Sequence, residues 1–314
     1  MSGEDQELPV FTTAADMRNW VRKQKKSGRK VALVPTMGYL HDAHLSLVKA
    51  ALEKADVVVA SIYVNPTQFA AHEDFDVYPR NADEDRAKLK AVGAHAVFEP
   101  ESLYVQVPGA SEGANVVGRE THHPDSHETY VTVERLQKPL CGGSRPHFFR
   151  GVCTVVTKLF HICEPDVAVF GRKDYQQFRV ISRMVRDLDF PIEVVGVPIG
   201  READGLAMSS RNARLSPESR EKALCLSRGL AWAEKAAAEG SVSDSAAVQA
   251  HVRGLIEEAG GKVDYVELLH AINLGPVTDL SSQPVLLALA VHFPAKDVGT
   301  VRLIDNTVLN PDKE

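Results

Sequence analysis

Short apolar runs rich in Val and Ile alternate, along the first two thirds of the chain, with segments whose apolar residues recur every three or four positions. Runs that are apolar on both faces and are separated by amphipathic helices are typical of a parallel sheet covered on each side. The runs are 31–35, 56–64, 94–100, 166–171 and 192–198, and the helical periodicity is clearest in 44–55, 152–162 and 174–188. We therefore predict a doubly wound, Rossmann-like α/β domain, whose ligands bind at the carboxyl ends of the strands.

The pattern changes after about residue 200. Two long helical patterns, 216–240 and 244–261, are followed by three strand candidates, 262–269, 285–293 and 300–309. The first helix has a good start, with Ser216 as N-cap and Pro217 at the first helical position. Helices followed by neighbouring strands indicate a smaller α+β domain. We predict a catalytic domain over 1–199 and a C-terminal domain over 200–314 that covers the active site.

Between residues 105 and 128 both periodicities fail, in a polar stretch with scattered Gly and Ser. It ends in "THHPDSHE" (121–128), which holds three histidines within six residues. Such a cluster could bind a metal, but without a Cys or a second group of ligands a solvated loop is favoured. We predict a surface insertion at 105–128 and no protein metal site.

The bulk composition narrows the class of protein. With 314 residues, 44% of them hydrophobic and 25% charged, the chain is typical of a soluble protein of two domains. Its 36 basic and 42 acidic residues give a net charge of −6, which argues against nucleic acid or an anionic membrane as partner. No apolar stretch is long enough to span a membrane, and the acidic start is unlike a targeting peptide. The four cysteines form no CxxC pair. We predict a cytoplasmic protein with reduced, mostly buried thiols.

Two histidines mark the first candidate for chemistry. If a helix opens near Leu40, the i, i+3 spacing places His41 and His44 on one face of its first turn. Backbone N–H groups and the helix dipole favour a phosphate there, and imidazoles donate hydrogen bonds and move protons near neutral pH. The alternative is one core histidine and one solvated histidine.

Three further polar stretches follow strand candidates or lie at the domain junction. "YVNPTQF" (63–69) presents Gln68 after a strand, although a turn amide is usually only a turn residue. "FGRKDYQQF" (170–178) places Gly171, Lys173 and Asp174 before a helix with Gln177, where a solvated Lys–Asp pair is equally compatible. "READGLAMSSRN" (201–212) offers two hydroxyls and a guanidinium, which suit a polyphosphate.

Neither a GxGxxG fingerprint nor a GxxxxGK[ST] loop occurs, so a dehydrogenase and a P-loop enzyme both lose support. Instead, motifs in order over most of the chain resemble the pantothenate synthetases, the pantoate–β-alanine ligases of the nucleotidyltransferase superfamily with HIGH-type signatures. The motifs are "VPTMGYLHDAHLSLV", "SIYVNPTQF", "DVYPR", "CGGSRP", "FRGVCTVVTKLF", "EPDVAVFGRKDYQQF", "MVRDLDFPIEVVG", "READGLAMSSRNARLS" and "TVRLIDN".

The resemblance implies a two-step ligation. Pantoate's carboxylate attacks the α-phosphate of ATP to give pantoyl adenylate and pyrophosphate, and the amine of β-alanine then displaces AMP. Mg²⁺ accompanies the ATP, and the protein is expected to be a homodimer. Attack at an α-phosphate builds negative charge, so preorganised cationic donors are expected to dominate catalysis.

The resemblance also implies residue roles. The catalytic group is His41, His44, Lys173, Ser209, Ser210 and Arg211, with His44 as the proton donor. ATP binding involves the same six together with Met37, Gly38, Gly171, Asp174 and Met208. The pantoate and β-alanine residues are Gln68 and Gln177, with Tyr78 and Arg145 nearby.

Three positions depart from the family pattern. Ala43 stands where the family has glycine, Arg172 where it has an acidic residue, and "RPHFF" (145–149) where it has "RPGHF". None of them removes a residue assigned to catalysis. The competing interpretations are another adenylyl-transferring enzyme of the same superfamily and a nucleotide-binding regulator without activity. A tRNA synthetase would need a tRNA-binding domain and usually a basic surface, and a regulator would be expected to lack the His, Lys or Ser-Ser-Arg residues.

Overall fold

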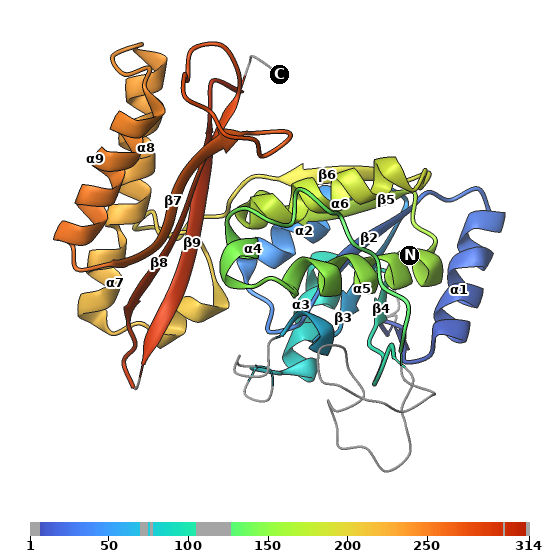
Figure 1. Ribbon diagram of the computed structural model, residues 1–314. Helices are drawn as coiled ribbons and strands as arrows, with labels where there is room; N and C mark the ends of the chain where they lie inside the picture. Colours follow the sequence, from blue (N-terminus) through green and yellow to red (C-terminus); the bar gives the residue numbers. More distant parts are fainter. Residues whose placement is uncertain (1–6, 70–74, 76–77, 105–126, 298, 312–314) are drawn as a thin grey trace. The chain divides into compact units, whose positions relative to one another are not determined.

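The computed structural model describes residues 7–69, 75, 78–104, 127–297 and 299–311. By its contacts the chain divides into two compact units, residues 1–172 with 180–197, and residues 173–179 with 198–314. The second unit thus takes in the short segment 173–179 as well as the C-terminal part of the chain. Figure 1 shows the course of the chain.

The first unit is built on a six-stranded parallel sheet with strand order β1-β4-β3-β2-β5-β6. The strands are β1 (Val10–Phe11), β2 (Val31–Thr36), β3 (Val57–Ile62), β4 (Ala96–Phe98), β5 (Val167–Gly171) and β6 (Glu193–Val197). The helices are α1 (Ala14–Lys26), α2 (Asp42–Leu52), α3 (Ala82–Val92), α4 (Cys141–Ser144), α5 (Phe148–Cys163) and α6 (Tyr175–Asp187). Short 3₁₀ turns lie at η1 (Pro66–Gln68) and η2 (Arg172–Asp174). Residues 173–179, which include most of η2 and the start of α6, belong to the second unit.

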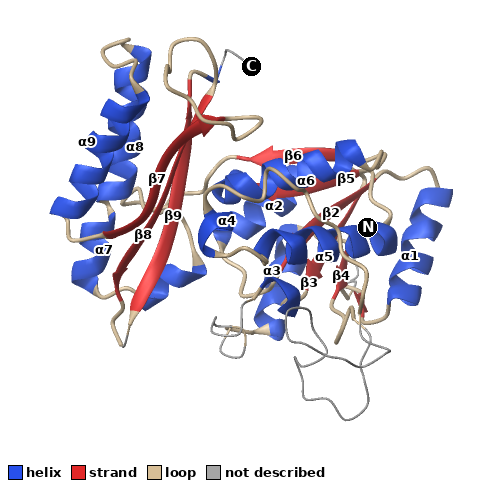
Figure 2. Ribbon diagram, viewed as in Figure 1, coloured by secondary structure: helices blue, strands red, loops and turns tan. Residues whose placement is uncertain are grey.

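Helices cover the central strands of this sheet on both sides (Figure 2). On one side α2 and α3 pack together, and the core between them and the sheet includes Ala32 and Val34 of β2 with Leu47 and Leu89 of the helices. Side chains of a strand alternate between the two faces, so the equally buried Leu33 points to the other side. There α1 packs against α5. Burial on both faces explains why the strands read as continuous apolar runs.

The strand order reverses between β2 and β5, which are neighbours in the sheet although more than one hundred residues separate them in sequence. In an open parallel sheet the connections leave to opposite faces at such a point, and ligands bind beside it at the carboxyl ends of the strands. The residues after Thr36 and at Gly171 occupy these two strand ends. The topology therefore indicates that the loop after β2 lies at the candidate ligand site.

The second unit is a three-stranded antiparallel sheet with helices packed on it (Figures 1 and 2). Its elements are η3 (Ser210–Arg214), α7 (Pro217–Ala223), α8 (Cys225–Ala238), α9 (Ser245–Glu258), β7 (Lys262–His270), β8 (Val285–Pro294) and β9 (Thr300–Leu309). α8 packs against β9, and α9 packs against β7. Their apolar stripes and the inner face of the sheet form one core. β8 lies in the centre and pairs with both other strands.

The predicted fold class, a doubly wound parallel α/β sheet with a smaller C-terminal α+β part, is confirmed. All eight predicted strands are present, and Ser216 caps α7 by accepting the N–H of Ser219. The single helix predicted over 216–240 is wrong, because it breaks at Leu224 into α7 and α8. The N–H of Leu224 bonds to the carbonyl of Glu221, a tight turn that ends α7.

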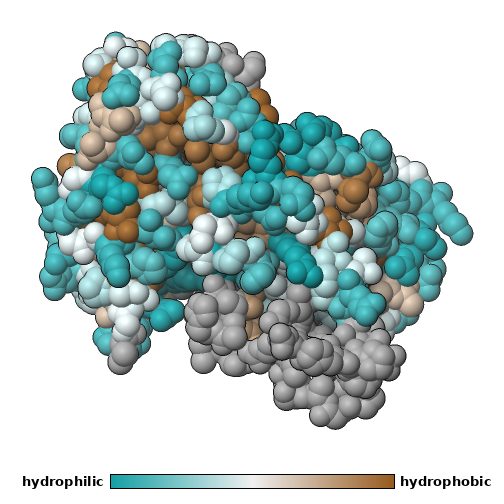
Figure 3. Space-filling view, in the orientation of Figure 1, coloured by the Kyte–Doolittle hydropathy of each residue, from teal (hydrophilic) through white to brown (hydrophobic). Residues whose placement is uncertain are grey.

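The cysteines lie in the interior of the protein, as predicted. All four cysteines are buried and free, and burial raises the pKa of the Cys153 thiol to about 12. In Figure 3 hydrophilic residues are spread over the visible face of both units with smaller apolar areas between them. No helix in the described part of the chain is long and apolar enough to cross a membrane. The predicted surface insertion, 105–128, lies outside the described residues except for its last two positions.

Candidate active site

The loop after β2 makes a sharp turn at the topological switch point. Gly38 has a φ of +83° and Tyr39 a φ of +53°, so two successive residues are in the left-handed region. A Cβ on Gly38 would lie 3.0 Å from Oδ2 of Asp85 and 3.1 Å from Cγ2 of Ile62. Both the backbone conformation and the close approach of these neighbours therefore favour glycine at this position.

A buried carboxylate holds this turn in place. Asp85 of α3 is 1% exposed, and its two oxygens accept the N–H groups of Tyr39 and Leu40, each at 2.7 Å. The ammonium of Lys88, one turn further along α3, donates to the carbonyl of Leu40 at 2.8 Å. Charge-assisted hydrogen bonds of this length are strong. The third helix of the fold thus fixes the conformation of the loop that leads to the histidines.

The two histidines lie together, although the helix begins later than predicted. α2 starts at Asp42 rather than near Leu40, so His41 is the N-cap residue, with extended backbone, and His44 is the third helical residue. Their ring centroids are 4.0 Å apart. The N–H of His41 donates to Nδ1 of His44 at 3.3 Å. A main-chain N–H can only donate, so Nδ1 is the acceptor and the proton of the neutral ring lies on Nε2.

The main-chain amides of residues 38–41 are engaged within the protein. The N–H of Gly38 donates to the hydroxyl of Thr36 at 3.2 Å, and those of Tyr39, Leu40 and His41 donate to Asp85 and His44. The expectation that backbone amides of this turn bind a phosphate is therefore revised for these four positions. The imidazoles of His41 and His44, both half-buried, are further hydrogen-bonding groups on this turn.

The amide of Gln68 is oriented by a buried polar network. Asn65, which is 1% exposed, donates through Nδ2 to Oε1 of Gln68 at 3.0 Å. Its own oxygen accepts the hydroxyls of Thr67 and Tyr104, both at 2.9 Å. Nε2 of Gln68 in turn donates to Sδ of Met37 at 3.2 Å. Because its oxygen is held by Asn65, Gln68 presents its NH₂ group.

α5 closes this network from the other side. A Cβ on Gly151 would come within 2.4 Å of the carbonyl oxygen of Thr67, so only glycine permits this approach of α5 to η1. The carbonyl of Gly151 also accepts from Nδ2 of Asn65 at 3.2 Å. Arg145 donates to the main-chain carbonyl of Gln68 at 3.3 Å, with its guanidinium stacked over the ring of Phe148 at 3.9 Å. Arg145 therefore contributes to the shape of the loop that carries Gln68.

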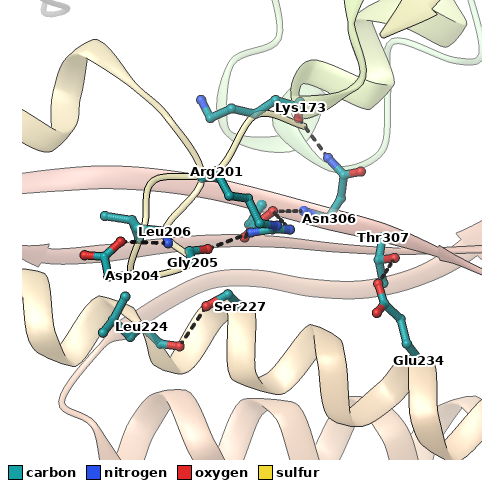
Figure 4. Close-up of polar contacts among 12 residues, drawn as sticks. Lys173, Arg201, Asp204, Gly205, Leu206, Leu224, Ser227, Glu234, Asn306 and Thr307 are labelled. Atoms are coloured by element: carbon teal, nitrogen blue, oxygen red, sulfur yellow. Dashed lines mark hydrogen bonds and ion pairs between the residues drawn. The ribbon is translucent and has the colours of Figure 1, made fainter. Parts of the chain in front are cut away.

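In the second unit, the segment of Lys173 is held by the last strand. Lys173 lies in η2, and its carbonyl accepts from Nδ2 of Asn306 of β9 at 2.8 Å (Figure 4). Asp174 is exposed, and Gln177 is half-buried on α6. The arrangement anchors the main chain of Lys173 while its ammonium stands at the end of a flexible side chain.

The loop 201–212 is fixed by ionic and amide contacts within the second unit. Ser209 caps η3, since its Oγ accepts the N–H of Arg211 at 3.2 Å. The buried Asn212 donates to the carboxylate of Glu202 at 2.6 Å, and Arg220 pairs with the same carboxylate, also at 2.6 Å. The N–H of Met208 donates to the carbonyl of Gly200 at 2.9 Å. Ser209, Ser210 and Arg211 thus extend from a well-anchored loop.

The structure brings several of the predicted site residues together within each unit. In the first unit these are His41 with His44, and Met37 and Arg145 with Gln68, while Tyr78 packs edge-on against the neighbouring Phe69. In the second unit Met208, Ser209, Ser210 and Arg211 share one loop. Gln68 and Gln177 belong to different units, so their common assignment to pantoate stays a prediction.

Three residues that shape the site, Asp85, Asn65 and Tyr104, were absent from the predicted set. Asp85 carried a weak signal, because it lies four residues before the buried Leu89 and so shares the inner face of its helix. Asn65 stands before a proline at a strand end, the position of an ordinary turn residue. The contact of Asn65 with Tyr104 spans 39 positions and has no local signature.

Comparison with known proteins decides between the candidate families. A family model described as pantoate-beta-alanine ligase matches residues 9–308. The chain belongs to the pantoate–β-alanine ligase family. The resemblance deduced from the motifs is thereby confirmed, and the chain is a member of a family of pantothenate-forming ligases.

Relatives of this family match nearly the whole chain. The chain is 51% identical over 308 residues to a pantoate–β-alanine ligase of Oryza sativa subsp. japonica, with 96% of each covered. It is 44% identical over 306 residues to a pantothenate synthetase of Geobacter sulfurreducens, with 98% of this chain and 100% of the relative covered.

Solved structures of the family share the fold. A pantothenate synthetase from Thermus thermophilus superposes with a TM-score of 0.80 at 39% identity, covering 96% of this chain and 99% of its own. A pantoate–β-alanine ligase from Francisella tularensis, complexed with β-γ ATP and β-alanine, gives a TM-score of 0.72 at 27% identity. The match covers 96% of this chain and 97% of that one.

Proposed function

We propose that the protein joins pantoate to β-alanine in an ATP-dependent reaction that passes through pantoyl adenylate. In the first step a carboxylate oxygen of pantoate bonds to the α-phosphorus of ATP, and the bond from that phosphorus to the bridging oxygen of pyrophosphate breaks. In the second step the amine nitrogen of β-alanine bonds to the acyl carbon, AMP departs with the bridging oxygen, and the nitrogen loses a proton. Family membership and the ATP complex of the Francisella tularensis relative support this proposal.

The observation that carries the proposal is the histidine pair at the switch point of the sheet. His44 has its Nδ1 engaged by the N–H of His41, so its Nε2–H is the donor for a phosphate oxygen or the departing pyrophosphate. His41 lies against it at a ring distance of 4.0 Å. Two imidazoles held in this way offer hydrogen bonds and a proton where negative charge grows in the transition state.

The remaining catalytic and ATP-binding assignments follow the family resemblance. We assign stabilisation of the phosphate charge to Lys173, Ser209, Ser210 and Arg211. We assign ATP binding also to Met37, Gly38, Gly171, Asp174 and Met208, with Gly171 and Asp174 at the ribose. In-line phosphoryl transfer needs little covalent chemistry from a protein, so donors placed in advance supply most of the rate.

Mg²⁺ is proposed to enter with ATP. Among the residues that the structure describes, no group of three or more His, Cys, Asp or Glu side chains could hold a metal ion. Mg²⁺ usually keeps several waters and binds through substrate phosphates, so a dedicated protein site is not needed. We propose that the ion arrives bound to the triphosphate and shields its charge there.

Gln68 is proposed to orient the carboxylate of pantoate through its NH₂ group, since its amide oxygen already accepts from Nδ2 of Asn65. A neutral amide suits this step, because a guanidinium clamp would stabilise the carboxylate against attack on phosphorus. Gln177, Tyr78 and Arg145 are proposed to complete the pantoate and β-alanine site. Their assignment rests on the family resemblance.

The organisation of the protein is proposed on the same basis. We propose that residues 1–199 form the ATP- and pantoate-binding catalytic domain and that residues 200–314 supply the Ser-Ser-Arg loop and cover the active site. We also propose a homodimer located in the cytoplasm. Sedimentation at micromolar concentration tests the oligomeric state.

Isotope exchange tests the reaction. With ATP and pantoate but no β-alanine, labelled pyrophosphate is expected to enter ATP, because only an adenylate intermediate makes the first step reversible without the amine. Formation of ADP and phosphate would instead mean attack at the γ-phosphate. Binding of ATP without exchange or product would favour a nucleotide-binding regulator.

Replacing Gln68 with alanine is expected to weaken pantoate binding while leaving ATP binding nearly unchanged. Removal of the amide leaves the carboxylate of pantoate without a hydrogen-bond donor. This costs roughly 1–3 kcal/mol of binding free energy, or about 5- to 150-fold in affinity. Calorimetric titration with pantoate and with a non-hydrolysable ATP analogue measures both. Gln24→Ala, on α1, is the matched control. Equal loss for the two ligands would show that Gln68 does not belong to the pantoate site.

A further inference from the structure

The stretch "TVRLIDN" (300–306) contributes to the family resemblance, yet none of its residues has a role in the proposed chemistry. It forms most of β9, which pairs with β8 along its whole length. Two polar residues end the stretch, and both are buried: Asp305 is 2% exposed and Asn306 is 6% exposed. Burial of a polar side chain costs free energy of folding unless the group is hydrogen-bonded, so the hydrogen bonds of these two residues indicate their role.

Asp305 ties the loop 201–212 to the strand. Its carboxylate binds both terminal nitrogens of Arg201, at 2.7 and 3.0 Å, in a bidentate ion pair. The same guanidinium donates to the carbonyl of Gly205 at 3.1 Å. Arg201 also bridges to Ala207 through an antiparallel main-chain pair. The carboxylate therefore fixes the loop just before the Ser-Ser-Arg residues.

Asn306 ties a second segment to the same strand. Its side-chain Nδ2 donates to the carbonyl oxygen of Lys173 at 2.8 Å, across 133 positions of sequence (Figure 4). Its main-chain N–H donates to Oδ1 of Asp305 at 2.8 Å, which links the two buried residues directly. Adjacent residues of one paired strand thus anchor Lys173 and the loop of Ser209.

We propose that Asn306 is a positioning residue for Lys173, with Asp305 as its anchor. By fixing the main chain of Lys173, Asn306 limits where the ammonium can reach and keeps it in register with the Ser-Ser-Arg loop that Asp305 holds through Arg201. This inference rests on the proposed function, in which Lys173 stabilises the phosphate charge. Misplacement of such a donor by about 1 Å can cost on the order of 10²-fold in rate.

A double-mutant cycle separates positioning from a general structural role. Asn306→Ala and Asn306→Asp are each made in the parent and in Lys173→Ala, since both remove the donor and the aspartate keeps the shape. If Asn306 acts through Lys173, its loss matters only while the ammonium is present. Asn310→Ala is the matched control, because Nδ2 of Asn310 donates to the main-chain carbonyl of Leu280 at 2.7 Å in the same unit.

Two readouts are used: pantoate-dependent pyrophosphate exchange at saturating ATP, and the Kd of a non-hydrolysable ATP analogue. In the parent, Asn306→Ala is expected to slow exchange by about tenfold. In the Lys173→Ala background, Asn306→Ala is expected to change the exchange rate by less than about twofold. The Kd of the ATP analogue is likewise expected to respond to Asn306→Ala in the parent and not in Lys173→Ala. Asn310→Ala is expected to leave both readouts within about twofold in either background.

The positioning role would be overturned if the Asn306 substitutions slowed exchange in Lys173→Ala by the same factor as in the parent. It would also be overturned if their effect in the parent were no larger than that of Asn310→Ala. Failure of the proposed function looks different. No pyrophosphate exchange by the parent, together with the expected coupling in the Kd, would refute the adenylate reaction while supporting the role of Asn306 in placing Lys173. If Lys173→Ala left the Kd and the exchange rate unchanged, both the role of Lys173 at the phosphates and the positioning role of Asn306 would be refuted.

Discussion

Replacing His44 with alanine is expected to slow adenylate formation by on the order of 10²-fold or more, the usual scale for removing a group that transfers a proton or stabilises charge. The geometry gives the reason. The N–H of His41 donates to Nδ1 of His44, so the proton of the neutral ring lies on Nε2, which in the proposed reaction donates to the phosphate. Alanine removes both the acceptor of the His41 N–H and the proposed donor to the phosphate. Single-turnover rates with ATP and pantoate measure the effect.

Two amide variants distinguish the two functions of this ring. His44→Asn retains an acceptor close to the position of Nδ1, and His44→Gln retains a hydrogen-bond donor close to that of Nε2. If His44 transfers a proton, both variants are expected to be as slow as alanine, because an amide cannot serve as a proton donor of this kind. Recovery of most of the rate by glutamine would instead assign charge stabilisation by hydrogen bonding.

The control for these variants is His251→Ala in the second unit, where His251 is exposed and stacks on Trp232 with centroids 3.7 Å apart. Its rate is expected to match that of the parent. A rate for His44→Ala within about threefold of the parent would mean that the pair at the start of α2 only caps the helix.

The sheet could be predicted from sequence because its central strands are buried on both faces. Six successive buried residues, as in β3, leave a run that is apolar except for Ser61, which an amphipathic helix or half-exposed strand does not produce. Elements without such a signal were missed. β1 has two residues, too few for any periodicity, and the polar helices α1 and α3 bury only two residues each.

The sequence predicted which residues lie close together where they are a few positions apart, and it missed the contacts between distant segments. The closeness of His41 and His44 follows from three residues of separation. The carboxylate that sets their loop lies more than forty positions away, and Asn306 lies 133 positions from the carbonyl it binds. The spacing to the buried Leu89 marks Asp85 among the three successive acidic residues 83–85, but no local pattern shows which segment its carboxylate binds.

Replacing Asp85 with alanine is expected to lower the free energy of unfolding by roughly 2–4 kcal/mol and to slow adenylate formation by at least about tenfold. The change removes the carboxylate that accepts the N–H groups of Tyr39 and Leu40, each at 2.7 Å. Leu40 is buried, so water does not readily replace the lost acceptor there. It also releases a turn in which Tyr39 keeps a φ of +53° against its own preference. The histidine pair follows directly on this turn.

Asp85→Asn and Asp83→Ala make the test specific. Asparagine keeps one of the two acceptor oxygens, so it is expected to fall between the parent and alanine in both stability and rate. Asp83 lies in the same turn of α3 with its side chain 98% exposed, and its replacement is expected to change neither quantity beyond about 0.5 kcal/mol or twofold. Urea denaturation and single-turnover rates, measured well below the midpoint of unfolding, keep the two effects apart.

If Asp85→Ala loses stability but forms adenylate at the parent's rate, the turn does not set the position of the imidazoles. If it resembles Asp83→Ala in both respects, the buried carboxylate does not hold the turn.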